Sequence, residues 1–214
     1  MHPWDVSPKK AIAIQKALQS HVNLTDDFGE IKTVAGVDVG FEKNNTITRA
    51  AIVVLDFQTL EVLESAVAHH PTSFPYVPGL LSFREVPCVL EAMLKLSAEP
   101  DLLLCDGQGI AHPRRFGIAA HLGLLLDIPA IGVGKSRLTG SHDEVPPEKG
   151  AHVPLMDKDE QIGVVLRTRT NVKPLYISPG HRVSIETAPG LVMQCVTRYK
   201  LPETTRHAHR LASC

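Results

Sequence analysis

The sequence predicts an α/β fold in which a mixed sheet, with three antiparallel strands followed by parallel strands, is flanked by helices. Strand-like runs at residues 31–39, 49–57 and 60–68 are separated only by short turn segments, as an antiparallel meander requires. From residue 101 onward, an apolar helix lies between apolar strands, which is typical of a parallel pair with a crossover helix. At 214 residues the chain is long enough for one core, so we expect a single domain over residues 1–214.

The first half of the chain contains two predicted helices and one irregular segment. Residues 8–20 carry apolar side chains at helical spacing, which predicts an amphipathic opening helix. Three prolines within residues 71–79 preclude regular structure there. A helix follows from about Glu85 to Ala98, with Pro87 tolerated in its first turn.

The second half continues the alternation of strands and helices. The predicted strands are 101–106, 130–133, 161–167 and 174–178, the predicted helices are 116–126, 184–197 and 203–212, and the polar segment 141–150 is a surface loop. An antiparallel meander that feeds parallel strands is the plan of a ribonuclease-H-like sheet. In such a sheet the first and fourth strands run side by side.

Composition limits the classes of function. The net charge is −1 and the sequence pI is about 6.8, so there is no overall basic character, and if nucleic acid is bound, it must be by a local basic face. Four cysteines without C-x-x-C spacing support neither a zinc site nor a redox motif. The N-terminus lacks a signal-peptide pattern, and no apolar run approaches the roughly 20 residues of a spanning helix. We therefore expect no membrane association and a cytoplasmic location.

Three acidic residues lie next to apolar segments. Asp38 and Asp106 each end an apolar strand-like run, and Glu85 lies where an apolar segment turns into a helical pattern. A carboxylate in such a place is costly to bury unless a partner compensates its charge, and a divalent cation is a natural partner. Each acid alone is adequately explained as a capping or salt-bridged residue. The three together indicate a Mg²⁺ site that serves phosphodiester chemistry.

Basic and glycine-rich segments accompany the acids. Gly107 and Gly109 let backbone amides approach a ligand closely. We expect Arg114 and Arg115 at a helix start, where the helix dipole favours anions. The alternative is a simple strand-to-helix turn with two solvated arginines. Other basic side chains that follow strands complete a potential phosphate-binding face: Lys135, Arg137 and Arg182.

Histidine is abundant, and position alone does not single out a functional one. Eleven are present. His209 lies on the predicted C-terminal helix, from which it could bind a metal, order a water molecule or transfer protons. The sequence pattern by itself does not favour His209 over His112, His181 or His207.

Several longer motifs resemble those of the endonuclease V family, the deoxyinosine 3′ endonucleases. The matching stretches are Val34-Ala-Gly-Val-Asp38, Phe74-Pro-Tyr-Val-Pro-Gly-Leu-Leu-Ser-Phe-Arg-Glu85, Asp106-Gly-Gln-Gly-Ile-Ala-His-Pro-Arg114, Ile131-Gly-Val-Gly-Lys-Ser136, Ser178-Pro-Gly-His181 and Leu201-Pro-Glu-Thr-Thr-Arg206. They span nearly the whole chain in the family's order. This sequence departs from the family pattern at Gly134, where alanine is commoner, and at Thr204, where proline is.

The resemblance implies a Mg²⁺-dependent enzyme, with Mn²⁺ as a substitute, that nicks the second phosphodiester 3′ of a hypoxanthine base and leaves 3′-hydroxyl and 5′-phosphate ends. Its partner would be DNA containing deoxyinosine, with inosine-containing RNA as a further candidate, and the enzyme would be a monomer that serves DNA repair. By matching positions the catalytic residues would be Asp38, Glu85, Asp106, His209 and Lys135, of which the first three hold the metal. The substrate-binding residues would be Tyr76, Gly79, Leu81, Gly107, His112 and Lys135, with Tyr76 as a strand-separating wedge.

Two other functions are compatible with parts of this pattern. One is a different ribonuclease-H-like nuclease, either a junction resolvase or a ribonuclease, which has no need of a proline-flanked wedge at Tyr76. The other is a non-catalytic module that binds inosine-containing nucleic acid, which would gain nothing from clustered acids near phosphates. Preference for DNA or RNA stays open, because both carry the same phosphate chemistry.

Overall fold

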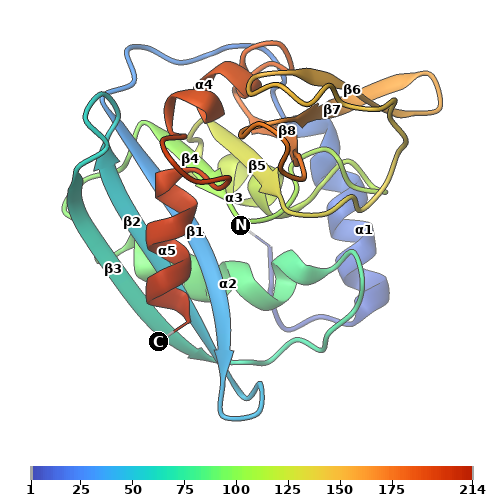
Figure 1. The fold of residues 1–214 in the computed structure, drawn as a ribbon. Coiled ribbons are helices and arrows are strands. Elements are labelled where there is room, and N and C mark those ends of the chain that lie inside the picture. Colours follow the sequence, from blue (N-terminus) through green and yellow to red (C-terminus); the bar gives the residue numbers. More distant parts are fainter. Residues whose placement is uncertain (1, 214) are drawn as a thin grey trace.

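The strands of the chain form one mixed sheet with helices on both faces (Figure 1). The computed structural model describes residues 2–213. Its strands are β1 (Thr33–Glu42), β2 (Ile47–Asp56), β3 (Val62–Pro71), β4 (Leu102–Cys105), β5 (Ala130–Gly134), β6 (His152–Asp157), β7 (Glu160–Leu166) and β8 (Leu175–His181). Its helices are α1 (Pro8–Leu18), the 3-10 helix η1 (Gln19–His21), α2 (Leu81–Met93), α3 (Ile118–Leu126), α4 (Ala188–Gln194) and α5 (Glu203–Ala212).

The order of strands across the sheet is β3-β2-β1-β4-β5-β8-β7-β6. β1, β2 and β3 form the predicted antiparallel meander. β4 pairs in parallel with β1, with Val34 opposite Leu102 and Val37 opposite Cys105, and β5 continues in parallel beside β4. The predicted mixed sheet and its ribonuclease-H-like order are therefore confirmed. Beyond β5 the pairing returns to antiparallel in β8, β7 and β6, and β6 was not among the predicted strands.

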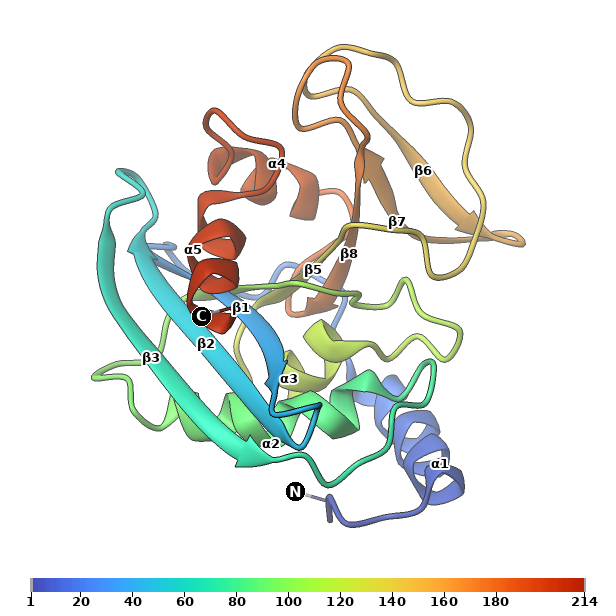
Figure 2. The same ribbon diagram turned by 60° about the horizontal axis from the view of Figure 1, so that its bottom comes forward.

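Two apolar cores hold the layers together. One lies between the sheet and helices α2 and α3, and the other lies between the sheet and helices α4 and α5. Figure 2 shows α5 on one side of the β1–β3 meander, with α2 and α3 on the other. All four residues of β4 are buried because successive side chains enter opposite cores. This burial explains why the strands at the centre of the sheet read as continuous apolar runs.

Several predicted boundaries are wrong by about a turn. α2 begins at Leu81 rather than Glu85, so Pro87 lies inside the helix and not in its first turn. Without an N–H, Pro87 cannot donate the helical hydrogen bond to the carbonyl of Phe83. Helix α4 covers only Ala188–Gln194 of the predicted 184–197, and β1 continues four residues past Asp38.

Helix α5 approaches β1 unusually closely because two glycines leave room for its backbone. A Cβ atom at Gly36 would lie 2.1 Å from the carbonyl oxygen of Thr204, and one at Gly40 would lie 2.2 Å from that of Ala212. Any side chain at either position would push the helix away from the strand. The two contacts fix both ends of α5 over β1, and His209 lies between them on the helix.

The described cysteines are structural. Cys88, Cys105 and Cys195 are buried free thiols, and burial raises their pKa values to about 11, 12 and 12. They therefore stay protonated and unreactive at neutral pH. Cys214 lies outside the described residues. Within residues 2–213, none of the helices combines the length and the apolar character needed to cross a bilayer.

His121 on α3 makes folding sensitive to acid. Its side chain is fully buried, its Nδ1 lies 3.0 Å from Ser82 Oγ, and its Nε2 lies 2.7 Å from His2 Nε2. Burial, with a smaller contribution from the charge of His2, lowers the pKa of His121 to about 3. In the unfolded chain the ordinary pKa of about 6.5 returns. The unfolded chain therefore binds a proton at His121 that the folded chain does not. The contribution of neutral His121 to the free energy of unfolding is complete above pH 6.5 and is lost as the pH falls toward 3.

Replacing His121 tests whether this residue causes the loss of stability in acid. His121→Gln should make the free energy of unfolding, measured with urea between pH 7 and pH 4, depend less steeply on pH, by up to about 1.4 kcal/mol per pH unit. His152→Gln, at an exposed position, should keep the wild-type slope. An unchanged slope in His121→Gln would show that His121 takes up no additional proton on unfolding.

Candidate active site

Three groups from different parts of the chain meet over the middle of the sheet. Ligand-type atoms of Asp38, Asp106 and His209 all lie within 4.8 Å of one another. Asp38 projects from β1, and Asp106 directly follows β4, where its N–H donates to the carbonyl of Val37 at 2.9 Å. His209 comes from α5. The parallel pairing of β1 with β4 and the close approach of α5 therefore bring together three of the residues predicted from the sequence.

Glu85 lies beside this group on α2 without joining it. Its side chain is 6% exposed and belongs to the interior. Burial, and then repulsion by Asp38 and Asp106, raises the pKa of Glu85 well above its ordinary value, against the attraction of Arg84. A cation bound between these acids would remove the repulsion and favour the ionised form.

The bond between His209 and Asp38 fixes which ring nitrogen faces the carboxylate. Nδ1 of His209 lies 2.7 Å from Asp38 Oδ2, and the other oxygen of Asp38 accepts the N–H of Val39 at 2.8 Å. A carboxylate only accepts, so Nδ1 carries the proton and the neutral ring keeps its lone pair on Nε2. His209 is 53% exposed at its side chain, whereas Asp38 is 11% exposed. Its free nitrogen can therefore meet a ligand that approaches from solvent.

Lys135 compensates Asp106 from the neighbouring strand. It directly follows β5, and its Nζ forms an ion pair with Asp106 Oδ2. Burial raises the pKa of Asp106, and repulsion by Asp38 adds to that effect while the hydrogen bond from Lys135 opposes it. The lysine side chain is 42% exposed, so its ammonium can also reach an anion in solvent.

The donor set fits a divalent cation of the hard type. It offers carboxylate oxygens and one imidazole nitrogen within a small radius, and Mg²⁺ and Mn²⁺ accept such ligands. Within residues 2–213, this is where at least three potential ligand side chains lie close enough together to share one ion. Asp38 and Asp106 would hold the ion with Glu85 behind them, and His209 would lie next to it on α5.

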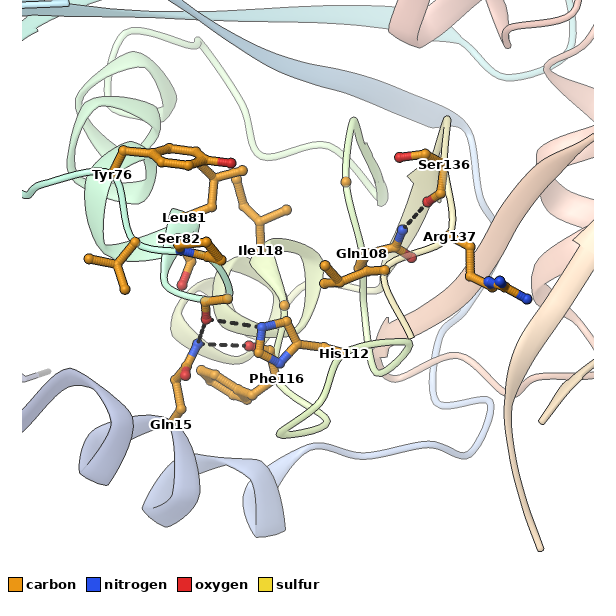
Figure 3. A pocket seen from close by; sticks show the side chains of 16 residues that line it. Gln15, Tyr76, Leu81, Ser82, Gln108, His112, Phe116, Ile118, Ser136 and Arg137 are labelled. Atoms are coloured by element: carbon orange, nitrogen blue, oxygen red, sulfur yellow. Dashed lines mark hydrogen bonds between the residues drawn. The ribbon is translucent and has the colours of Figure 1, made fainter. Parts of the chain in front are cut away.

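A cavity of about 310 Å³ opens near the acidic group. Figure 3 shows the side chains around it, with Tyr76 and Leu81 on one side and Gln108, Ser136 and Arg137 on the other. Five of the predicted substrate-binding residues line this cavity: Tyr76, Gly79, Leu81, Gly107 and His112. Gly107 directly follows Asp106 in the chain, so the wall of the cavity is continuous with the acidic group.

Tyr76 directly precedes a tight turn. The N–H of Leu80 donates to the carbonyl of Val77 at 2.9 Å, and Gly79 has a φ of +78°. With Pro78 at the second position and glycine at the third, residues 77–80 form a type II turn. The Tyr76 ring next to it is 71% exposed. Tyr76 is therefore not part of the core, and its ring is accessible from solvent.

The predicted basic face is only partly present. Arg114 and Arg115 do not start a helix, because α3 begins at Ile118 after Gly117. Arg115 forms ion pairs with Asp157 and Glu160, and Arg182 forms ion pairs with Asp27 and Asp127. Neither arginine is thus freely available to a phosphate.

Two other lysines are near enough to Lys200 for their charges to affect it. The pKa of Lys200 is lowered by burial and then by the charges of Lys173 and Lys135. Lys173 and Lys200 are on connected loops, because Thr168 Oγ1 donates to the Lys200 carbonyl. These three lysines are far apart in the sequence, so no local signal could have grouped them. Gln15 and Gln108 line the cavity, but no local sequence signal marks either of them as a cavity residue.

The sheet order and the acidic group together define a metal-dependent nuclease of the ribonuclease-H-like class. Residues 16–210 match the sequence model of the Endonuclease V family, and the chain belongs to that family. Endonuclease V of Rippkaea orientalis is 59% identical over 207 residues, which are 97% of this chain and 90% of that relative.

Solved structures agree with this assignment. The crystal structure of endonuclease V from Streptomyces avermitilis is similar with a TM-score of 0.93 and 42% identity, covering 98% of this chain and 93% of that one. Endonuclease V of Ciona intestinalis, solved in complex with a 24mer DNA containing an inosine followed by a ribo-adenosine, is similar with a TM-score of 0.83 and 27% identity. That match covers 96% of this chain and 95% of the other.

Removing one acid of the group should weaken metal binding. Asp38→Asn and Asp106→Asn each delete a charged ligand, so we expect Mn²⁺ affinity, measured by calorimetry, to fall by more than about tenfold, and strand cleavage to be abolished. Asp127→Asn is the matched control. Asp127 ends α3 in a left-handed conformation that asparagine also adopts. Wild-type Mn²⁺ affinity in both Asp38→Asn and Asp106→Asn would contradict the assignment of these residues to a metal site.

His209 and His207 provide a second comparison on one helix. Only His209 bonds to Asp38, so His209→Ala should lower the cleavage rate far more than it weakens nucleic-acid binding, and should change the pH–rate profile. His207→Ala should leave both rate and profile close to wild type. Equal losses in the two variants would instead point to destabilisation of α5.

Proposed function

We propose that this chain is a Mg²⁺-dependent endonuclease that nicks inosine-containing nucleic acid at the second phosphodiester 3′ of the hypoxanthine base. The products carry 3′-hydroxyl and 5′-phosphate ends, the physiological role is DNA repair, and Mn²⁺ substitutes for Mg²⁺. The observation that carries the proposal is the continuity of Asp106 with Gly107, which joins a group of metal ligands to a base-sized cavity. A strand with one base in the cavity would bring its backbone toward the acidic group.

The acidic group supplies the hydrolytic chemistry. A Mg²⁺ ion held there would lower the pKa of water and stabilise negative charge on the phosphate. His209 Nε2 has the lone pair needed to accept a proton from the attacking water, because Nδ1–H is committed to Asp38. The ammonium of Lys135 stands beside Asp106 and is exposed enough to pair with a phosphate oxygen.

The cavity supplies the selection of the base. An enzyme that reads a base edge must remove that base from the stack, at a cost of a few kcal/mol that is lower for a weakened pair. The main chain of Gly79 and Gly107 lines the cavity beside Leu81 and His112, where it can meet the hydrogen-bonding edge of hypoxanthine. Burial lowers the pKa of His112 to about 4, so its imidazole stays uncharged at neutral pH.

Substrate and setting follow from related observations. The Ciona intestinalis protein binds DNA in which a ribo-adenosine follows the inosine, which supports DNA containing deoxyinosine as the partner and keeps inosine-containing RNA as a further one. The three buried cysteines remain free thiols, as expected for a reducing cytoplasm. We propose that the enzyme acts there as a monomer and a single domain.

A cleavage assay on matched strands tests this function. Purified protein with Mg²⁺ should nick a DNA duplex with one inosine at the second phosphodiester 3′ of that base, and should leave the same duplex with adenine intact. The cut is mapped against a sequencing ladder, and a matched RNA strand measures the preference for sugar. Cleavage without regard to inosine would favour a different ribonuclease-H-like nuclease, and binding without cleavage would favour a non-catalytic module.

The exposed ring of Tyr76 leads to a prediction that separates duplex from single strands. Stacking of an aromatic ring on a base contributes about 1–3 kcal/mol, and the type II turn presents this ring with little loss of entropy. Tyr76→Ala should therefore weaken binding and nicking of inosine in duplex DNA by tenfold or more, about 1.4 kcal/mol. The loss on single strands should be smaller and the melting temperature unchanged. Equal losses on both substrates would argue against a wedge.

A further inference from the structure

Gln15 lies outside every motif described above, yet it is a buried polar residue next to the cavity. It belongs to α1, is 1% exposed and lines the cavity from below in Figure 3. Its Nε2 donates to the carbonyls of Gly79, at 2.9 Å, and Phe116, at 3.2 Å. Its Oε1 accepts a hydrogen bond from Nε of Arg114. All polar atoms of this buried amide are thus engaged with the walls of the cavity.

Three donors converge on the carbonyl oxygen of Gly79. Besides Gln15, Arg114 donates from Nη2 at 2.6 Å and His112 contributes Nε2 at 3.0 Å. Nδ1 of His112 accepts the N–H of Arg114 at 3.1 Å, so the neutral ring carries its proton on Nε2 and donates to Gly79. A carbonyl has two lone pairs, and three donors leave it no freedom to rotate.

The Gly79 peptide has few other restraints. The turn at residues 77–80 closes through one hydrogen bond, from Leu80 to Val77, and a glycine at a positive φ is easily converted to other conformations. A main-chain group that can rotate presents either its N–H or its C=O to a base. It would then accept bases with opposite patterns of donors and acceptors. Selectivity therefore requires that this peptide be held in one orientation.

We propose that Gln15 is a specificity-determining positioning residue, which with Arg114 and His112 locks the Gly79 peptide in the orientation that discriminates hypoxanthine from other bases. This inference rests on the proposed function. Gln15 has no contact with the acidic group. It acts on recognition through Gly79, and on the presentation of Tyr76, which precedes the same turn. Helix α1 is thereby part of the recognition apparatus, and does more than cover the fold.

The test compares Gln15→Met with wild type. Methionine fills nearly the same volume but neither donates nor accepts the hydrogen bonds of the amide. Gln15→Glu is the second variant, because it keeps the acceptor for Arg114 and loses the donor to Gly79. Lys16→Gln, at the exposed next position of α1, is the control. Binding of duplexes with inosine or adenine at one position is measured by fluorescence anisotropy with Ca²⁺ in place of Mg²⁺, together with the melting temperature of each variant.

We expect Gln15→Met and Gln15→Glu to lower the ratio of affinities for inosine over adenine by about tenfold or more, while affinity for the adenine duplex stays within about twofold. Mn²⁺ affinity should be unchanged in both variants. An unchanged ratio in either stably folded variant would overturn the proposal, and so would equal losses on the two duplexes with a lower melting temperature. A wild-type protein that does not prefer inosine would instead overturn the proposed function, independently of Gln15.

Discussion

Mutual repulsion among the carboxylates over the centre of the sheet is the constraint on which the rest of the structure depends. Asp38 and Asp106 are close because β1 and β4 pair in parallel, and Glu85 faces both from the interior. In a medium of low dielectric constant such a group is unstable without positive partners. Lys135, which directly follows β5, provides one, and His209 on α5 donates a hydrogen bond to Asp38. The acidic group therefore depends on two features of the fold. The sheet order brings Lys135 next to the carboxylates, and the close approach of α5 to β1 brings His209 next to them.

The base-sized cavity and the acidic centre are connected through the main chain. Asp106 and Gly107 are consecutive, and Gln108 Nε2 donates to the carbonyl of Ser136 at 2.9 Å, next to Lys135 (Figure 3). The strand-to-loop junctions after β4 and β5 thus carry both a group for phosphate chemistry and a wall of the cavity. This is the usual position of functional residues in a parallel sheet, at the carboxyl ends of adjacent strands.

Much of the fold could be predicted from the sequence because its signals are local. Alternating turns and apolar runs identified β1 to β5, and the motif containing Tyr76 and Gly79 identified the wall of the cavity. Edge strand β6 escaped because it is short, half exposed and contains Pro154. Arg115 and Arg182 were assigned to phosphate because their acidic partners, such as Asp157, are distant in sequence. Gln15 gave no signal at all, since a glutamine in an amphipathic helix is ordinary until its burial is known.

Gly134 lies where one additional methyl group would disturb a contact between the two loops that follow β4 and β5. A Cβ atom there would lie 2.3 Å from Gln108 Nε2, the atom that bonds to Ser136. Gln108 is flexible at its end, so alanine would be accommodated at small energetic cost by turning the amide away. An alanine at this position would therefore weaken the hydrogen bond by which Gln108 connects the loop after β4 to the loop after β5. The side chain at residue 134 thus bears on how firmly the loops after β4 and β5 are joined, although it touches none of the acidic residues.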